Sequence, residues 1–276
     1  MRELDIPIHD VCQLAQQAGA AIMTIYEQGF EVTTKADNSP LTEADLASHQ
    51  ILECGLQQLT PSFPVLSEES SATAIAQRHN WQTFWMLDPL DGTKEFVNRN
   101  GEFTVNIALI HKGDPVFGVV YVPVTKELYW GGESYGAWRQ FDNKSPTAIS
   151  VREPQTPPIV VGSRSHLTDE VKQFIEQIPA AELTSIGSSL KFCLLAQGQA
   201  DLYPRLGPTS EWDTAAADAV LRGAGGQVID LNTQQAMRYN QRETLLNPNF
   251  VAFTARGTWW GALLLAHTRY QERNGL

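Results

Sequence analysis

Apolar residues near the start of the chain recur at spacings of three and four, which places them on one face of a helix. The pattern runs from Val11 to Tyr26 and predicts an amphipathic helix there. A polar loop, Lys35–Pro40, follows, and Thr42 then opens a second expected helix. The apolar positions of that helix are Leu46, Leu52, Leu56 and Leu59.

Short runs of β-type residues follow these helices and predict strands, with Lys112–Asp114 as a hairpin turn. The expected strands are Phe84–Leu87, Val105–Ile110, Val116–Val122 and Leu128–Trp130. The second half alternates instead. Its expected strands are Ile159–Gly162, Leu183–Ile186, Ala200–Tyr203 and Gln227–Ile229, with helices beginning at Thr168, Ser189 and Thr214. We therefore expect an α+β domain over residues 1–146 and an α/β domain over residues 147–276.

The composition permits a sizeable core. Of 276 residues, 42% are hydrophobic and 18% charged, which suits one large or two medium domains. Asp and Glu outnumber Lys and Arg by 31 to 20, giving a formal net charge of −11. This balance argues against a nucleic-acid polymer or an anionic membrane as partner. A small anionic substrate stays compatible with it if metal ions reverse the charge locally.

Cysteine usage and apolar runs bear on the compartment. Cys12, Cys54 and Cys193 are far apart and form no CxxC pair, which predicts reduced thiols in a cytoplasmic protein. No secretory signal and no run of the roughly 18 apolar residues of a spanning helix is recognisable. Trp259–Ala266 is shorter, and we interpret it as a docked C-terminal helix in preference to an interfacial one. Any membrane contact is expected to be peripheral, at the cytoplasmic face of the inner membrane.

Several phosphate-handling chemistries are excluded by counting. No cysteine has an arginine six residues later, no Asp-x-Asp-x-Thr/Val run is present, and no Gly-Lys dipeptide offers a P-loop. The glycines of Gly223–Gly226 fail the dinucleotide fingerprint, because Val228 stands where its last glycine belongs. Carboxylates remain as the candidate chemistry.

The segment WMLDPLDGTKEF, residues 85–96, holds the most suggestive carboxylates. Asp88 and Asp91 flank a proline that fixes its own φ, so both side chains can converge on one point beside the Leu90 carbonyl. Gly92 and Thr93 can begin a helical turn suited to a phosphate. Hard oxygen ligands of this kind favour Mg²⁺. An ordinary Asp-Gly turn explains the segment equally well.

Three further acidic spots have simple structural explanations when each is taken alone. Glu68-Glu69 can be solvated surface. Asp45 completes a capping box with Thr42 at the start of the second helix. Asp213 can be the N-cap of the alanine-rich helix that follows it.

Taken in order, these segments resemble the lithium-sensitive, Mg²⁺-dependent inositol monophosphatase superfamily. The matching pieces are SPLTEAD (39–45), LSEES (66–70), WMLDPLDGTKEF (85–96) and EWDTAAADAV (211–220). Lys94-Glu95 stands where inositol phosphatases usually show Thr-Asn, and residues 96–110 and 185–205 also resemble the bacterial 3′(2′),5′-bisphosphate nucleotidases of the CysQ type. The resemblance implies a layered α-β-α-β-α sandwich of the inositol monophosphatase and fructose-1,6-bisphosphatase type, often a homodimer.

The resemblance also assigns roles. Glu68, Asp88 and the Leu90 carbonyl would hold one Mg²⁺, and Asp88, Asp91 and Asp213 a second. Asp45 and Thr93 would position and deprotonate the attacking water, with Glu69 close by. Five such carboxylates place a charge of about −5 in one cleft, which two to three Mg²⁺ would bring to between about −1 and +1. The metals would thus create the phosphate site.

Substrate recognition is expected in the second half, where Gly187, Ser188 and Ser189 form a strand-to-helix junction. Their backbone N–H groups could take a second phosphate or a ribose hydroxyl, and an ordinary turn and N-cap explains them equally well. Candidate partners for the phosphate that is not cleaved are Lys191, Arg205 and Lys94. Tyr203 and Trp212 could flank the base, although core packing is favoured for Trp212.

The resemblance therefore implies a cytoplasmic phosphomonoesterase that converts adenosine 3′,5′-bisphosphate to AMP and phosphate in sulfur assimilation. The sulfated analogue, 3′-phosphoadenylyl sulfate, is a plausible second substrate. One alternative is an inositol-phosphate or sugar-phosphate phosphatase with the same metal core. The other is a catalytically silent nucleotide- or Mg²⁺-binding regulator, against which the intact acidic set argues.

Overall fold

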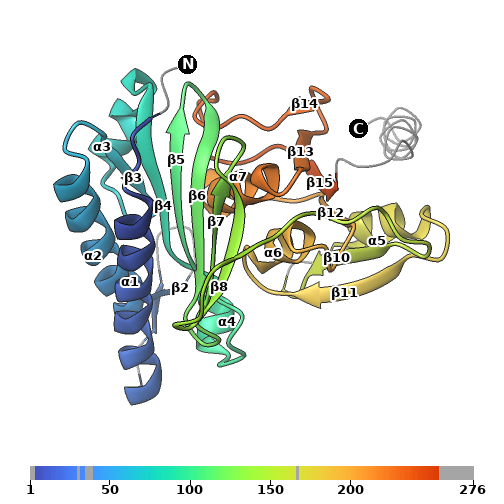
Figure 1. Ribbon diagram of the computed structural model, residues 1–276, viewed down its shortest axis with the longest axis horizontal. Helices are drawn as coiled ribbons and strands as arrows, with labels where there is room; N and C mark the ends of the chain where they lie inside the picture. The colour runs from blue at the N-terminus through green and yellow to red at the C-terminus, as the bar shows by residue number, and fades with distance from the viewer. Residues whose placement is uncertain (1–3, 30–31, 35–39, 166–167, 255–276) are drawn as a thin grey trace.

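Two β-sheets and the helices that face them form five layers, in the order helices, sheet, helices, sheet, helix (Figure 1). The computed structural model describes residues 4–29, 32–34, 40–165 and 168–254. The expected C-terminal helix at 259–266 lies outside the described residues.

The first layer consists of α1 (Ile8–Gln28) and α2 (Glu43–Leu59), separated by a hairpin of β1 (Val32–Thr34) and β2 (Pro40–Thr42). The predicted helix from Val11 to Tyr26 lies within α1, whose buried residues include Ala15, Ala18 and Ile22 at the expected spacing. The second helix starts where it was predicted, because Thr42 is its N-cap.

The second layer is a seven-stranded sheet in sequence order from β3 to β9, in which the β3–β4 pair is parallel and the other pairs are antiparallel. Its strands are β3 (Val65–Ser67), β4 (Thr83–Asp91), β5 (Thr104–His111), β6 (Asp114–Val122), β7 (Glu127–Gly132), β8 (Gly136–Phe141) and β9 (Thr147–Ala148). The four predicted strands lie within β4 to β7. The predicted turn has positive φ at Lys112 and Gly113, as a tight hairpin requires.

Short helices connect this sheet to the site. Between β3 and β4 lie α3 (Ala72–Gln77) and the 3₁₀ turn η1 (Arg78–Asn80). After β4 comes α4 (Thr93–Val97), at one end of the sheet, which confirms the helical turn expected at Gly92 and Thr93 (Figure 1).

Side chains alternate across the first sheet, so it supports two cores at once. On β4, Trp85 and Leu87 pack with α1 and α2, whereas Phe84 and Met86 face the central layer. The sheet is therefore covered on both faces.

The fourth layer is a six-stranded sheet with the order β11-β10-β12-β15-β13-β14. Its strands are β10 (Ile159–Ser163), β11 (Glu182–Ile186), β12 (Leu202–Arg205), β13 (Gly226–Asp230), β14 (Gln235–Ala236) and β15 (Phe250–Thr254). The predicted alternation holds as far as β13, and β10 pairs in parallel with β11 and β12. The sheet as a whole is mixed, because β15 returns between β12 and β13 and is antiparallel to both.

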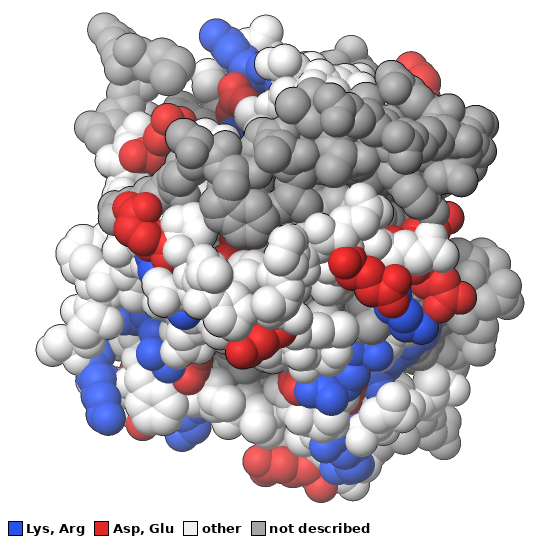
Figure 2. All heavy atoms as spheres, turned by 90° about the vertical axis from the view of Figure 1, so that its right-hand side faces the viewer, with Lys and Arg blue, Asp and Glu red and all other residues white. Residues whose placement is uncertain are grey.

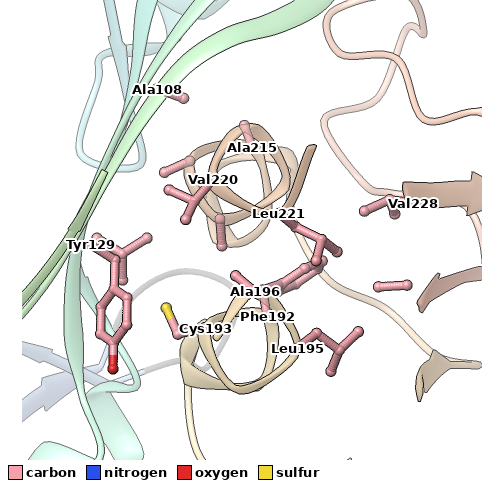
Figure 3. Close-up of a cluster of buried hydrophobic side chains, with 14 of the residues drawn as sticks. Ala108, Tyr129, Phe192, Cys193, Leu195, Ala196, Ala215, Val220, Leu221 and Val228 are labelled. Atoms are coloured by element: carbon pink, nitrogen blue, oxygen red, sulfur yellow. The ribbon is translucent and has the colours of Figure 1, made fainter. Parts of the chain in front are cut away.

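The central layer is formed by α6 (Leu190–Ala196) and α7 (Ala215–Gly223), while α5 (Asp169–Glu176) covers the outer face of the second sheet. Small residues let α7 approach closely: a Cβ added to Gly118 of β6 would lie 2.0 Å from the carbonyl oxygen of Ala216. Figure 3 shows the larger side chains around these helices, with Tyr129 facing Cys193. The core thus joins both halves of the chain, and the division at residue 146 stays a prediction.

Three further features concern the cysteines, the apolar content of the helices and the charges on the surface. All three cysteines are free thiols. Over the described residues, none of the helices combines the length and the apolar content needed to cross a bilayer. On the face seen in Figure 2, Lys and Arg side chains are interspersed with Asp and Glu over the described area.

Candidate active site

A cleft of about 520 Å³ opens where the end of β4 and α4 meet the segments around α6, β12 and α7. Most of the predicted site residues line it: Glu68, Asp88, Leu90, Asp91, Gly92, Thr93, Ser188, Ser189, Lys191, Arg205 and Asp213. Lys94 and Tyr203 line it as well. Asp45, Glu69 and Gly187 do not line this cleft.

A β-bulge brings Asp88 and Asp91 to the same cleft. The register between β4 and β5 shifts between these two residues, so Pro89 and Leu90 together oppose the single residue Val105 of the facing strand. The Leu90 N–H donates to Oδ1 of Asp88 at 3.1 Å, and the Ser48 hydroxyl donates to the Pro89 carbonyl at 2.7 Å. These two hydrogen bonds fix the backbone at Pro89 and Leu90.

Asp91 links the two halves of the molecule. Its Oδ2 accepts the backbone N–H of Ser189 at 2.6 Å and the amide of Asn106 at 3.3 Å. The Ser189 hydroxyl in turn donates to Asn106 Oδ1 at 2.9 Å. The strand-to-helix junction of the second half is thus bound directly to the first sheet.

Glu68 and Asp213 reach the cleft from turns on either side. The Glu68 N–H donates to the Leu87 carbonyl at 3.1 Å, which keeps this turn beside β4. Asp213 ends the 3₁₀ turn η2 (Glu211–Asp213), and its Oδ2 accepts the Ser210 N–H at 2.9 Å. Asp213 therefore completes the capping box of η2, whose N-cap is Ser210, whereas the N-cap of α7 is Thr214.

These carboxylates are buried close together, which disfavours their charged forms. Burial raises the pKa of Asp88 well above its usual range, and Glu68, Asp91 and Asp213 raise it further. The pKa of Asp213 is raised in the same way, by burial first and then by Asp91 and Glu68. Burial also raises the pKa of Asp91, although Lys191 opposes this. A bound cation would relieve this repulsion.

The donor set fits a hard divalent cation. Carboxylate and carbonyl oxygens are the ligands that Mg²⁺ prefers, and no thiol or imidazole lines the cleft among the described residues. Within that part of the chain, no three His, Cys, Asp or Glu side chains lie close enough together to hold a metal ion as they stand. The fit rests on the donor chemistry and on the accumulated negative charge.

Asp45 lies behind the cleft and contacts it through Thr93. One oxygen, Oδ2, accepts from the Thr42 N–H at 2.8 Å and from the Thr42 hydroxyl at 2.7 Å, so the predicted capping box is present. The other, Oδ1, accepts from the Thr93 hydroxyl at 3.5 Å. Asp45 is only 1% exposed and also raises the pKa of Asp88.

The opposite wall is cationic. Lys191 is 5% exposed, its ammonium donates to the Ser188 carbonyl, and it lies 5.3 Å from the centre of the Tyr203 ring. Burial, with Arg205 nearby, lowers the pKa of Lys191 to about 8. Arg205 is 7% exposed and donates to the Pro208 carbonyl at 2.5 Å. Its Nε and the hydroxyl of Ser188 are buried without a hydrogen-bond partner among the described residues.

Two carboxylates that the sequence analysis passed over shape this wall. Glu95 is buried, lines the cleft and accepts from the Ser165 hydroxyl at 2.5 Å. Glu102 accepts the Gly187 N–H at 2.7 Å and pairs with Arg164 at 2.6 Å. Glu95 could have been noticed, because Lys94-Glu95 stands where inositol phosphatases usually show Thr-Asn. No local sequence pattern indicates a role for Glu102.

The aromatic candidates differ in their surroundings. Tyr203 lines the cleft but is only 2% exposed. Its ring packs edge-on against Phe192, with 5.2 Å between the ring centres. Trp212 packs against the central core, the role that was favoured for it.

Comparisons with known proteins agree with this picture. Residues 7–270 match the profile of the Inositol monophosphatase family. The 3′(2′),5′-bisphosphate nucleotidases CysQ of Salmonella typhimurium and of Escherichia coli K12 are each 51% identical over 245 residues, covering 88% of this chain and 98% of theirs. The crystal structure of CysQ from Bacteroides thetaiotaomicron is 41% identical with a TM-score of 0.80, covering 92% of this chain and 100% of that one. An inositol monophosphatase from Anabaena, 23% identical with a TM-score of 0.71, shares the fold over 95% of this chain and 94% of its own.

The chain therefore belongs to the inositol monophosphatase family, and the expected layered α-β-α-β-α sandwich is confirmed. Within the family, the resemblance to the bacterial 3′(2′),5′-bisphosphate nucleotidases is confirmed by the identities with the CysQ proteins.

Proposed function

We propose that this protein is a Mg²⁺-dependent 3′(2′),5′-bisphosphate nucleotidase that hydrolyses the 3′-phosphate of adenosine 3′,5′-bisphosphate to give AMP and phosphate. One observation carries the proposal: a single cleft has clustered carboxylates on one wall and two buried cations, Lys191 and Arg205, on the other. A substrate with two phosphates can use both walls at once. A monophosphate can use only one.

Glu68, Asp88, the Leu90 carbonyl, Asp91 and Asp213 would hold two to three Mg²⁺. When bound, the cations supply positive charge for the phosphate oxygens and the leaving alkoxide and lower the pKa of the attacking water. The carboxylates alone would repel the substrate, so their function depends on this neutralisation.

Thr93 and Asp45 would take the proton of the attacking water. The Thr93 hydroxyl faces the cleft on one side and Oδ1 of Asp45 on the other, so a proton can pass from water to Thr93 and from Thr93 to Asp45. Asp45 then acts as general base at Oδ1, while Oδ2 stays bound to Thr42. Glu69, which follows Glu68 in the same turn, stays a proposed neighbour of this group.

The phosphate that is not cleaved would bind Lys191, Arg205 and Ser188 on the other wall. The Arg205 Nε and the Ser188 hydroxyl lack protein partners in the described residues, and a phosphate oxygen would satisfy both. The Gly187 and Ser189 N–H groups are already donated to Glu102 and Asp91. These two residues would therefore shape the phosphate site through the path of the backbone.

The reaction belongs to sulfur assimilation, and 3′-phosphoadenylyl sulfate is the proposed second substrate. A cytoplasmic location, lithium sensitivity and a homodimer remain parts of the proposal. The alternative is an inositol-phosphate or sugar-phosphate phosphatase, which would use the carboxylate wall in the same way. A monophosphate substrate of such an enzyme would leave the cationic wall without a ligand.

A phosphate-release panel tests the proposal. The protein with Mg²⁺ is assayed on adenosine 3′,5′-bisphosphate, inositol 1-phosphate and fructose 1,6-bisphosphate at matched concentrations. We expect kcat/KM for the nucleotide to exceed that for inositol 1-phosphate, which has one phosphate, by at least ~10-fold, the gain from one charge-assisted hydrogen bond to the second phosphate. Fructose 1,6-bisphosphate also carries two phosphates, so it tests whether the adenosine is needed as well. Equal turnover of inositol 1-phosphate would replace the nucleotidase assignment by the alternative.

A further inference from the structure

Glu211 is a carboxylate that the proposed chemistry does not use, yet it is completely buried, with 0% of its surface exposed. Its Oε2 accepts the backbone N–H of Asn240 at 2.6 Å, and its Oε1 accepts from the Arg242 guanidinium at 2.8 Å. Its own backbone N–H donates to the Leu245 carbonyl at 2.8 Å. Both the side chain and the backbone of Glu211 are thus bound to residues 240–245.

Arg78 holds that segment from the first half of the chain. Its guanidinium donates to Asn240 Oδ1 at 2.5 Å and to the carbonyls of Arg242 and Glu243 at 2.8 and 2.6 Å, and it is only 1% exposed. Asn240 returns a hydrogen bond from Nδ2 to the Arg78 carbonyl at 2.8 Å. The anchor of Glu211 is therefore itself fixed to η1.

Glu211 and Asp213 are the first and last residues of the same 3₁₀ turn, η2. A 3₁₀ helix has three residues per turn, so a shift of one end moves the other. A buried carboxyl group held by two hydrogen bonds resists displacement, because moving it leaves buried donors and acceptors without partners. We infer that Glu211, bound to Arg242 and the Asn240 N–H, is a positioning residue that fixes the carboxylate of Asp213 for metal binding.

This inference rests on the proposed function only in taking Asp213 as a metal ligand. It is tested by metal binding without nucleotide, so a wrong substrate assignment would leave the result intact. The probe is Mn²⁺ alone, with the unbound ion counted by electron paramagnetic resonance, on the full-length wild-type protein and on Asp213→Asn as the reference for a lost ligand.

Glu211→Gln keeps the size of the side chain. Its amide N–H₂ would face either the Asn240 N–H or the Arg242 guanidinium, and two donors cannot hydrogen-bond to each other. Loss of the partner that orients a metal ligand typically weakens metal binding about 10–100-fold. We expect a loss in this range, approaching that of Asp213→Asn, and a matching rise in the Mg²⁺ concentration that gives half-maximal activity. At saturating Mg²⁺, KM for the nucleotide should change much less.

The chain offers a matched control in Asp201, which is also 0% exposed and binds Arg152 through both oxygens, at 2.9 and 2.7 Å. Asp201→Asn should lower the melting temperature and leave the Mn²⁺ affinity within about 2-fold of wild type, the scatter expected for an effect confined to stability.

Two results overturn the inference. One is Mn²⁺ affinity of Glu211→Gln within about 2-fold of wild type, well outside the range for a positioning partner. The other is an equal loss of affinity in Asp201→Asn, which would make the effect a general consequence of lost stability. If Glu211→Gln does not fold, Arg242→Met decides in the same way, because Arg242 is 27% exposed and its loss removes only one of the hydrogen bonds to Glu211.

Discussion

Thr93 and Asp45 are joined across the back of the cleft by a hydrogen bond of 3.5 Å from Oγ1 to Oδ1, while the other oxygen of Asp45 caps helix α2. One carboxylate therefore has two separable roles. Each oxygen serves one of them.

Asp45→Asn should separate the two roles. Thr42 is the N-cap of α2, and Asp45 accepts its two hydrogen bonds from position N3. An Asn amide oxygen can accept the same bonds, so the loss of stability should be roughly 1 kcal/mol. An amide cannot accept the proton, so kcat should fall about 10²–10⁴-fold. Melting temperature and kcat are measured on the same preparation, with the exposed first-turn residue Glu43→Gln as control. An unchanged kcat would leave Asp45 with the capping role alone.

Metal removal should abolish activity. EDTA is expected to stop phosphate release and added Mg²⁺ to restore it, and Asp91→Asn should lower kcat by at least ~10³-fold because it removes a proposed ligand. Asp169→Asn, on the exposed start of α5, serves as control and should behave as wild type. Full activity in EDTA would contradict the proposed metal centre.

Lys191 should contribute through the phosphate that is not cleaved. A charge-assisted hydrogen bond to phosphate is worth about 1.5–3 kcal/mol, or roughly 10–150-fold in kcat/KM. We expect 3′-AMP, which lacks the 5′-phosphate, to be a poorer substrate by this factor, and Lys191→Ala to cause a similar loss on the bisphosphate but little more on 3′-AMP. Lys172→Ala on the surface of α5 is the control. Equal losses on both substrates would place Lys191 at the reacting phosphate or in folding.

The same residue predicts a pH dependence. Because burial lowers the pKa of Lys191 to about 8, its ammonium is lost as pH rises through that value, well below its ordinary pKa of about 10.4. The kcat/KM for the bisphosphate, which reports the free enzyme, should therefore fall above pH 8. The ratio of kcat/KM for the bisphosphate to that for 3′-AMP isolates this effect. A ratio that stays constant from pH 7 to 9.5 would exclude it.

Because α7 packs closely on the first sheet, adding a single methyl group at Gly118 should lower the free energy of unfolding. Gly118→Ala would place a Cβ 2.0 Å from the backbone carbonyl of Ala216, which cannot swing aside as a side chain can. Overpacking of this kind costs about 1–3 kcal/mol. Urea unfolding measures it, with Gly207→Ala as control, because the nearest atom there would be 3.8 Å away. Equal stability of the two variants would show that α7 is free to shift.

The elements with a strong local pattern were predictable from the sequence. Helix α2 begins at Thr42 because a capping box is a local signal, and the strands within β4 to β7 follow from their apolar runs. Strand β8 was missed because Trp138 and Phe141 are exposed and break the usual alternation. Strand β15 was missed because all five of its residues are buried, and a short run without alternation has no diagnostic period.

Some residues of the site could be predicted from the sequence, and others could not. The carboxylates around Pro89 stand in one local motif, so their meeting in a cleft could be expected. Glu102 could not be found this way, because its role depends on contacts with Arg164 and Gly187, which lie 62 and 85 positions further along the chain. Such partners are defined only when the two sheets pack.

The hydrogen bond from Ser189 to Asp91 has an evolutionary consequence, because its donor is a backbone N–H. Any residue except proline supplies that group, so this hydrogen bond would survive an exchange of the side chain at position 189, which would remove only the contact of its hydroxyl with Asn106. A gene with this architecture can acquire a new substrate preference by point mutations in one short loop, provided that the course of the loop is kept. Insertions or deletions there would disturb Asp91 itself, so substrate diversification is expected to proceed by substitution and not by changes in loop length.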